Sequence, residues 1–378
     1  MDSINRVNQW LQAHNYEGYD PFDGLNSNLS FLTFQIPFLR QVFIQAVKRL
    51  PLNIRPLIGI SPQKSSKGIA YIIRGDLLLY KSTGDESYFV RAKNLLDWLE
   101  RNHCNGYSGY CWGNHFDYQT RGYFLKKNNP TLVWTALTGR SFVEAFEITG
   151  LEKYLNIVDS TCNFIINDLP KVQEKDSLCI SYIKNTINLV HNANLLGAAM
   201  LAQGYKLTHN DDYKNIAKMA VQYSLNHQRE DGSWFYGQEK KYHWIDNWHT
   251  AYNLDALKIY EEYTGDTEYS SQIKKGLKFY VNNFFLPDGT PKYYFNSVYP
   301  IDIQCASQSI DTLVFFKKYN QNYVELAYKV SKWTIANFQD RDGHFYLWKN
   351  KYFTNKTPTL HWAQATMYHA LANLFVNS

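Results

Sequence analysis

A short turn motif recurs along this chain at a nearly regular interval. It has the form Thr-Gly-Asp or a close variant, with Tyr five residues after the Thr, and its copies begin at Thr83, Thr149, Thr208 and Thr264. A degenerate copy lies near Tyr319. The copies are roughly 55 to 66 residues apart, and self-similarity of this length is typical of repeat architectures, in which each unit buries its apolar face against its neighbours.

Each unit has the pattern of a helical hairpin with one short and one long connection. The glycine of the turn can take the left-handed conformation that ends a helix, and the Asp after it is a preferred cap for the next helix. The first helices of the units are expected at 66–82, 131–149, 191–207, 247–264, 304–319 and 361–376. The second helices are expected at 87–103, 151–168, 211–228, 269–283 and 321–338.

This arrangement leaves one first helix without a partner. A helix around residues 30–49 would fill the place and close the ring against the C-terminal helix. The sequence therefore predicts an all-α fold, a closed (α/α)6 toroid of six helical hairpins with the first helices inside and the ring closed by the N- and C-terminal helices. No linker-like or low-complexity tract divides the sequence, so residues 1–378 are expected to form a single domain. An open solenoid is the alternative.

Two of the long loops begin with a similar phrase. Gln228 to Trp234 has the form Q-x-x-x-G-x-W and resembles the repeats of squalene-cyclase and prenyltransferase α-toroids, and Gln339 to Phe345 resembles them in part. In those proteins the phrase ties a helix end to the next turn. The resemblance supports the toroid and implies no particular chemistry.

Charge and composition exclude some classes of function. The net charge of +5 comes from interspersed residues without a basic stripe, so no nucleic-acid partner is expected. No stretch approaches 18 apolar residues and the N-terminus lacks an apolar signal segment, so we expect no membrane insertion and a cytoplasmic location. The five irregularly spaced cysteines fit reduced thiols.

Polar and aromatic residues cluster at one phase of the repeat, just before or at the start of each expected inner helix. Equivalent phases lie at one end of a closed ring, so five loops should converge on one mouth. Tryptophan faces beside Asn, Gln, His and Arg suit the C–H faces and hydroxyls of a sugar. The expected substrate-binding residues are Trp112, His115, Arg121, Asn192, Asn194, Trp244, Trp248, Tyr252, Tyr299, Gln304, His361 and Trp362.

Acid/base groups lie in the same clusters. Asp117, Asp246 and Asp302 are candidate acids, because glycosyl chemistry often uses carboxyl groups. Asp246 and Asp302 could equally be helix caps. His191, His249 and His361 are the candidate bases, since histidine exchanges protons near neutral pH, and His191 and His249 are favoured among them.

A metal site is a weaker alternative. His191 and His249 could share zinc with Cys305, as in lanthionine-cyclase-like toroids, but the sequence lacks a recognised ligand spacing. Phosphate-binding and dinucleotide-binding motifs are also absent from the sequence. We therefore expect neither a metal nor a cofactor.

Several segments resemble a known group of proteins. Residues 111–121, 130–150, 191–202, 228–237, 244–257 and 300–310 look like VpsJ-like α-toroid proteins of bacterial polysaccharide gene clusters. The toroid also resembles N-acylglucosamine 2-epimerases, unsaturated glucuronyl hydrolases and the helical part of glucuronyl C5-epimerases. None of their catalytic signatures can be carried over residue by residue.

These resemblances imply a function in glycan metabolism. The resulting hypothesis is an enzyme of surface-polysaccharide biosynthesis or tailoring that hydrolyses, eliminates or epimerises a saccharide or oligosaccharide by acid/base chemistry. One alternative is a glycan-binding or scaffold protein without catalysis, and another is a zinc-dependent or isoprenoid-type toroid enzyme. The oligomeric state stays open.

Overall fold

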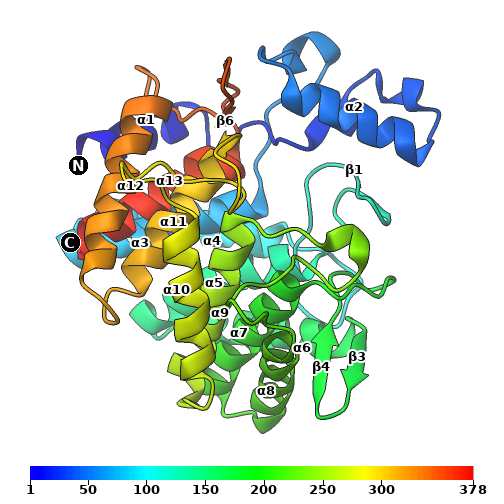
Figure 1. The fold of residues 1–378 in the computed structure, drawn as a ribbon, viewed down its shortest axis with the longest axis vertical. Coiled ribbons are helices and arrows are strands. Elements are labelled where there is room, and N and C mark those ends of the chain that lie inside the picture. The colour runs from blue at the N-terminus through cyan, green and yellow to red at the C-terminus, as the bar shows by residue number, and fades with distance from the viewer. Residues whose placement is uncertain (378) are drawn as a thin grey trace.

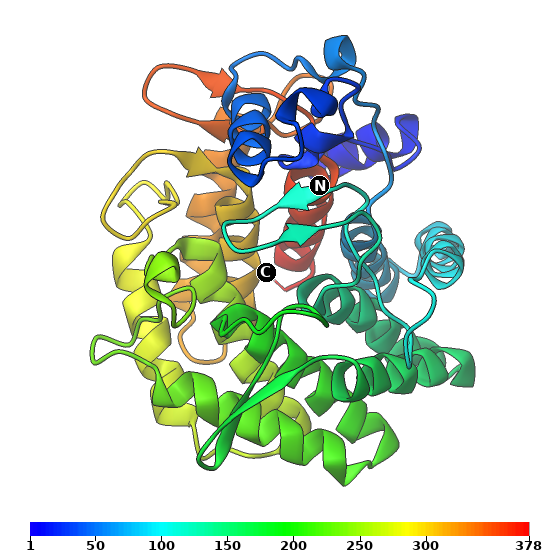
Figure 2. The ribbon, with the colours of Figure 1, turned by 90° about the vertical axis from the view of Figure 1, so that its right-hand side faces the viewer.

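Six inner helices form a closed ring in the computed structural model, which describes residues 1–377 (Figures 1 and 2). Each inner helix packs on the next, and the last packs on the first. The predicted closed (α/α)6 toroid is therefore confirmed. The inner helices are α3 (Ser66–Thr83), α5 (Leu132–Thr149), α7 (His191–Thr208), α9 (Asn247–Thr264), α11 (Ile303–Phe315) and α13 (Ala365–Asn377).

Inner and outer helices differ in how much of their surface they bury. In α7 every residue from His191 to Gly204 is buried, because the helix has neighbours on all sides. The outer helix α8 (Asp211–Asn226) buries only one stripe at helical spacing, which includes Tyr213, Ala217 and Ala220. The other outer helices are α4 (Glu86–Arg101), α6 (Glu152–Asn167), α10 (Ser270–Asn283) and α12 (Asn322–Phe338).

The sixth outer helix is α1 (Asp2–Ala13), and the prediction that residues 30–49 would fill this place is wrong. Helix α1 packs on α13 through an apolar face that includes Val7 and Trp10. Helix α2 (Pro37–Arg49) buries little more than Ile44 and Val47, and its neighbours are η1 (Asp23–Asn26), η2 (Ser30–Thr33) and β1 (Tyr118–Gln119). The apolar residues of 30–49 suggested a helix in contact with the ring, but most of them face outward.

The two glutamine phrases join consecutive outer helices. Gln228 Nε2 donates to the carbonyl of Gln272 in α10 at 3.1 Å, and Gln339 Nε2 donates to the carbonyl of Ser3 in α1 at 3.1 Å. Gly343 follows the second glutamine with φ of +100°, and a Cβ there would overlap the backbone of Arg6. The phrase after α12 therefore contacts α1 as the phrase after α8 contacts α10, which places α1 sixth in the outer ring.

The short turns and the long loops lie at opposite ends of the ring. Gly84, Gly150 and Gly265 end their inner helices in the left-handed conformation, with φ between 65° and 72°. The long loops carry small antiparallel strands: β1 (Tyr118–Gln119) with β2 (Phe124–Leu125), β3 (Lys171–Glu174) with β4 (Ser177–Ile180), and β5 (Ile301–Asp302) with β6 (Trp348–Lys349) and β7 (Thr354–Asn355). No helix within residues 1–377 is long and apolar enough to cross a membrane.

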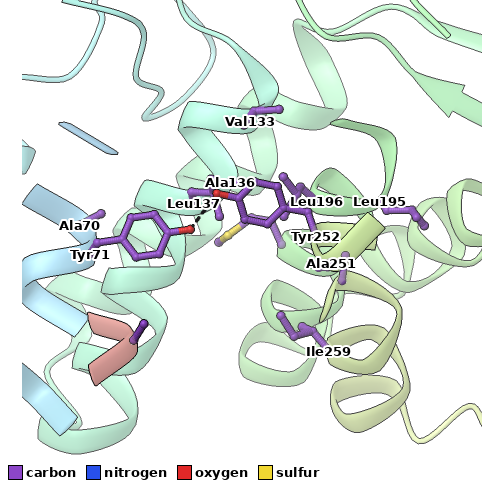
Figure 3. Packing of buried hydrophobic residues seen from close by; sticks show 14 of the residues in the cluster. Ala70, Tyr71, Val133, Ala136, Leu137, Leu195, Leu196, Ala251, Tyr252 and Ile259 are labelled. Carbon is purple, nitrogen blue, oxygen red and sulfur yellow. Dashed lines mark hydrogen bonds between the residues drawn. The ribbon is translucent and has the colours of Figure 1, made fainter. Parts of the chain in front are cut away.

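A pair of tyrosines crosses the centre of the ring. The hydroxyls of Tyr71 in α3 and Tyr252 in α9 lie 3.1 Å apart, among apolar residues such as Ala136, Leu137 and Leu196 (Figure 3). Tyr71 and Tyr252 line one cavity of the interior. Lys67 and Trp248, one turn earlier on the same two helices, line a second cavity. The tyrosine pair therefore divides the interior into an upper part, at the long loops, and a lower part.

The contact between Gly343 and α1 predicts a stability difference. We expect Gly343→Ala to lower the free energy of unfolding by at least about 2 kcal/mol, because backbone strain of about 1–3 kcal/mol adds to the overlap with Arg6. Gly84→Ala is the matched control, since Gly84 also has a positive φ but open space around it. It should lose only about 1 kcal/mol. Urea unfolding measures both, and equal losses would show that the contact with α1 contributes nothing.

Candidate functional site

A cavity of about 660 Å³ opens at the end of the ring where the inner helices begin. Its wall includes residues from the starts of α3, α5, α7 and α9 and from η5 (Leu360–Gln364), the π-helical turn before α13. Helix α2 and the β1–β2 hairpin border its opening. Of the residues selected from sequence, the wall contains Arg121, Asn192, Trp244, Trp248, His249, His361 and Trp362.

His249 is held by the residue that caps its helix. Asp246 is the N-cap of α9, and its Oδ1 accepts a hydrogen bond from the His249 backbone N–H at 3.0 Å. Its Oδ2 accepts from Trp244 Nε1 at 2.9 Å and lies 2.6 Å from His249 Nδ1. A carboxylate only accepts hydrogen bonds, so this contact places a proton on Nδ1 and leaves Nε2 for a ligand.

His361 has a second carboxylate beside it. His361 Nδ1 lies 2.6 Å from Asp20 Oδ2, and both side chains are buried. Burial lowers the pKa of His361 although Asp20 opposes this effect. Burial alone would raise the pKa of Asp20. The charges of His361 and His115 and a hydrogen bond from the Phe22 N–H outweigh this effect of burial, so the pKa of Asp20 lies below its usual value.

The two histidines flank a pair of tryptophans. Trp248 and Trp362 meet edge to face with centroids 5.2 Å apart, and each is the sequence neighbour of one histidine. Lys67 lies against the same ring system, with Nζ 6.0 Å from the centroid of Trp362. Burial lowers the pKa of Lys67 to about 8, and Asp20 opposes this shift. The cavity thus combines two imidazoles, an ammonium group and flat apolar faces.

Several polar atoms of the cavity wall have no hydrogen-bond partner within the described chain. They are the buried side-chain oxygens of Asn114, Asn188 and Asn192, the indole nitrogen of Trp248, and Nδ1 of His361, which is at ion-pair distance from Asp20 Oδ2 without forming a hydrogen bond to it. Buried polar atoms are rarely left unpaired in folded proteins. A ligand with many hydroxyl groups would provide the missing partners.

The three aspartates selected as acids lie outside this wall. Asp246 supports His249 from behind. Asp302 is the N-cap of α11 and accepts from the indole N–H of Trp362 at 2.7 Å, so it is buried behind that ring. Asp117 accepts from the Lys127 backbone N–H at the surface. The two capping positions anticipated from sequence are therefore present.

His191 lies in the core of the repeat. Its Nδ1 is 3.1 Å from Ser224 Oγ and its Nε2 is 2.7 Å from Gln238 Nε2. Burial lowers the pKa of His191 to about 3, with a smaller contribution from His227. Both ring nitrogens have protein partners, so the geometry favours a structural role.

The remaining sequence candidates are separated from the cavity. Trp112 is buried between layers and donates to the Leu99 carbonyl at 3.0 Å. Asn194 hydrogen-bonds to the backbone of Ile180 and Ala220. His115 lies behind Trp134. Tyr252 and Gln304 belong to the central tyrosine contact. Tyr299 is 41% exposed.

Sequence reasoning missed Asp20, Lys67 and Trp134. Asp20 lies in the N-terminal segment before the first repeat, where no periodicity pointed to it. Lys67 and Trp134 begin α3 and α5 at the same phase as the residues that were selected, so this phase could have revealed them.

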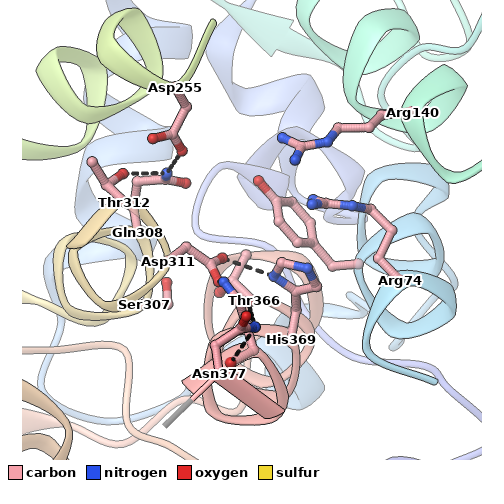
Figure 4. A network of polar contacts seen from close by, with 12 residues as sticks. Arg74, Arg140, Asp255, Ser307, Gln308, Asp311, Thr312, Thr366, His369 and Asn377 are labelled. Atoms are coloured by element: carbon pink, nitrogen blue, oxygen red, sulfur yellow. Dashed lines mark hydrogen bonds and ion pairs between the residues drawn. The ribbon is translucent and has the colours of Figure 1, made fainter. Parts of the chain in front are cut away.

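The lower cavity is smaller and its charged groups largely pair with one another. It measures about 300 Å³ and contains Arg74 paired with Glu144 at 2.8 Å. Figure 4 shows His369 beside Asp311 in the same region, at 2.8 Å. Burial raises the pKa of Asp255 there to about 7. This region has the character of a polar core. Within residues 1–377 no three His, Cys, Asp or Glu side chains form a group that could hold a metal ion.

Comparison with known proteins gives structural neighbours but no sequence relatives. No family model and no curated protein matches the sequence. The chain resembles cellobiose 2-epimerase from Bacillus thermoamylovorans with a TM-score of 0.64 at 12% identity, covering 83% of this chain and 87% of the other. A D-mannose isomerase gives 0.62 at 13% identity, with coverage of 82% and 86%.

An unsaturated glucuronyl hydrolase specific for heparin gives a TM-score of 0.61 at 14% identity, with coverage of 84% and 88%. These likenesses show that the fold is shared with (α/α)6 carbohydrate epimerases, isomerases and hydrolases. At such low identity they show nothing beyond the fold. The resemblance to VpsJ-like proteins stays a prediction.

Proposed function

We propose that this protein is a carbohydrate epimerase or isomerase that moves a proton at the carbon next to a sugar carbonyl. The observation that carries the proposal is the presence of His249 and His361 in one cavity, each with Nδ1 2.6 Å from a carboxylate oxygen. Proton transfer at carbon needs one group that removes a proton and one that supplies it. Two oriented imidazoles meet this need.

The burial of His361 suggests that this histidine is the base. The lowered pKa of His361 keeps its imidazole neutral near pH 7, so its Nε2 accepts the proton from the carbon next to the carbonyl. The C–H electron pair moves toward the carbonyl and gives an enediolate. His249, supported by Asp246, donates a proton from Nε2, as an imidazolium beside a carboxylate does in other enzymes. Donation to the opposite face of the same carbon epimerises the sugar, and donation at the neighbouring carbon isomerises it.

Lys67 supports the negatively charged intermediate. A pKa of about 8 keeps most of its ammonium charged at neutral pH, within a buried environment. A fixed charge in such a site stabilises a developing oxyanion more strongly than the same charge in water. The faces of Trp248 and Trp362 and the unpartnered asparagine oxygens would position the sugar carbons and hydroxyls.

The structural neighbours agree with this chemistry, since several of them are sugar epimerases or isomerases by name. Hydrolysis by paired carboxyl groups has less support, because Asp117, Asp246 and Asp302 lie outside the cavity wall. A role in surface-polysaccharide tailoring, a cytoplasmic location and a single-domain chain remain part of the proposal and rest on the sequence. The second candidate is a glycan-binding protein, favoured by the aromatic and amide lining alone.

Solvent deuterium incorporation tests the proposed reaction. Incubation with a panel of aldoses, ketoses and disaccharides in D2O should label one sugar at the carbon next to its carbonyl, as detected by NMR. His249→Asn and His361→Asn should each lower the labelling rate about 10²–10⁴-fold, the usual contribution of an acid/base group.

A matched pair of capping residues provides the control. Asp246 and Asp302 both cap an inner helix and both accept a tryptophan N–H, but only Asp246 contacts a histidine. We expect Asp246→Asn to lose far more activity than Asp302→Asn. Labelling that survives both histidine substitutions would exclude the mechanism, and saturable glycan binding without labelling would favour the binding protein.

The pH dependence tests the assignment of His361 as the base. Because burial lowers its pKa, the acid limb of kcat/KM should lie below the ordinary histidine value of 6.5. Asp20→Asn removes a charge that raises this pKa, so the limb should move to lower pH while kcat falls. The rate should also fall above about pH 8, where Lys67 loses its charge. A purely structural role for Asp20 would lower kcat without moving the limb.

A further inference from the structure

Exposed apolar side chains are concentrated in one segment beside the mouth. Ten of the nineteen large apolar side chains that are exposed within residues 1–377 belong to residues 29–57. Phe31, Phe34 and Phe38 are 67%, 72% and 69% exposed, and Leu52 and Leu57 are 75% and 86% exposed. The other five are Leu29, Leu32, Ile36, Val42 and Leu50. Such a concentration marks an interaction surface, because single exposed apolar residues are normally scattered.

A neighbouring hairpin extends this surface. The indole of Trp348 donates to the Lys48 carbonyl at 3.3 Å, and Asn355 Nδ2 donates to the Leu50 carbonyl at 2.7 Å. The hairpin carries Tyr352, which is 86% exposed. Helix α2 and the β6–β7 hairpin lie at the same end of the ring (Figures 1 and 2). We refer to residues 29–57 and 348–356 together as the apolar rim.

The charge of the apolar rim is entirely basic. Residues 29–57 contain Arg40, Lys48, Arg49 and Arg55 and no Asp or Glu, and the hairpin contains only lysines as charged residues. Arg55 forms an ion pair with Asp23 at 2.8 Å, which balances its charge. The positive charges of other basic residues, such as Arg49, remain on this surface. An apolar surface with only basic charge is complementary to the anionic headgroups and acyl chains of a membrane surface.

A second copy of the chain fits this surface less well. In a twofold dimer the same patch faces itself, so the basic groups of the two copies would repel one another. An acidic protein partner would match the charge alone, but the most exposed residues of the rim are aromatic and aliphatic side chains. A lipid surface matches both properties.

We propose that the apolar rim docks this protein on an anionic lipid surface. The thirteen residues of α2 are too few to span a bilayer, for which about 20 are needed, so the helix would lie in the interface. The sequence expectation of no membrane insertion considered only spanning segments, and this shallow contact goes beyond it. Gln45, Lys48 and Arg49 of α2 also line the upper cavity, so docking would bring the mouth beside the membrane. The inference does not depend on the reaction proposed above.

Vesicle cosedimentation of the full chain tests the proposal. The protein should bind vesicles of phosphatidylcholine with phosphatidylglycerol, bind phosphatidylcholine alone at least tenfold more weakly, and lose affinity as salt is added. The triple variant Phe34→Ser, Phe38→Ser, Leu52→Ser should bind the anionic vesicles at least tenfold more weakly. These side chains are exposed and do not line the cavity, so folding should be retained, as circular dichroism can verify.

A matched variant controls for the loss of apolar surface as such. Val90→Ser, Leu151→Ser, Ile187→Ser removes three exposed apolar side chains elsewhere and should bind as the unaltered protein does. The proposal is overturned if the unaltered chain fails to bind anionic vesicles or if both triple variants bind equally. It is also overturned if sedimentation shows a dimer that the rim variant alone dissociates while vesicle binding is unchanged.

Discussion

Closure of the ring between its last and first inner helices is the constraint on which the rest of the structure depends. Asp76 of α3 is fully buried and accepts a hydrogen bond from Tyr368 of α13 at 2.6 Å and another from Arg91 of α4 at 2.7 Å. A buried carboxylate is stable only when it is paired in this way. The contact therefore seals the ring, and it fixes α13 and the turn that carries His361.

Closure also explains how the two acid/base pairs arise. The pair of His249 and Asp246 is local, three residues apart at one helix start. The pair of His361 and Asp20 joins distant segments and exists only because the C-terminal helix returns to the beginning of the chain. At this end the inner helices begin, and the positive ends of their dipoles would favour an anionic intermediate in the cavity. The tyrosine contact of Tyr71 and Tyr252 separates that site from the paired charges below.

The fold was predictable from sequence because it repeats. The turn at Gly84, Gly150 and Gly265 recurs in sequence and in conformation, and each inner helix begins within a few residues of its expected position. The outer partner of α13 was not predictable from apolar content alone. Residues 29–57 are apolar and still face outward, whereas the short α1 buries a stripe and is tied to the ring by Gln339.

The site was predictable only in part, for a related reason. The phase of the repeat located His249, Trp248, His361 and Trp362, because they begin inner helices. It could not tell a wall residue from one buried behind the wall, such as Asp302, since that difference depends on side-chain packing. Asp20 was out of reach because its partner is more than 300 residues away in sequence.

The most direct test of the central claim is a crystal structure with a bound open-chain sugar alcohol, which cannot react. The account predicts that the polyol lies in the upper cavity, with Nε2 of both His249 and His361 within hydrogen-bond distance of its hydroxyls. The free oxygens of Asn114 and Asn192 should then gain partners. A polyol bound only in the lower cavity beside Arg74, or one that contacts neither histidine, would contradict the account.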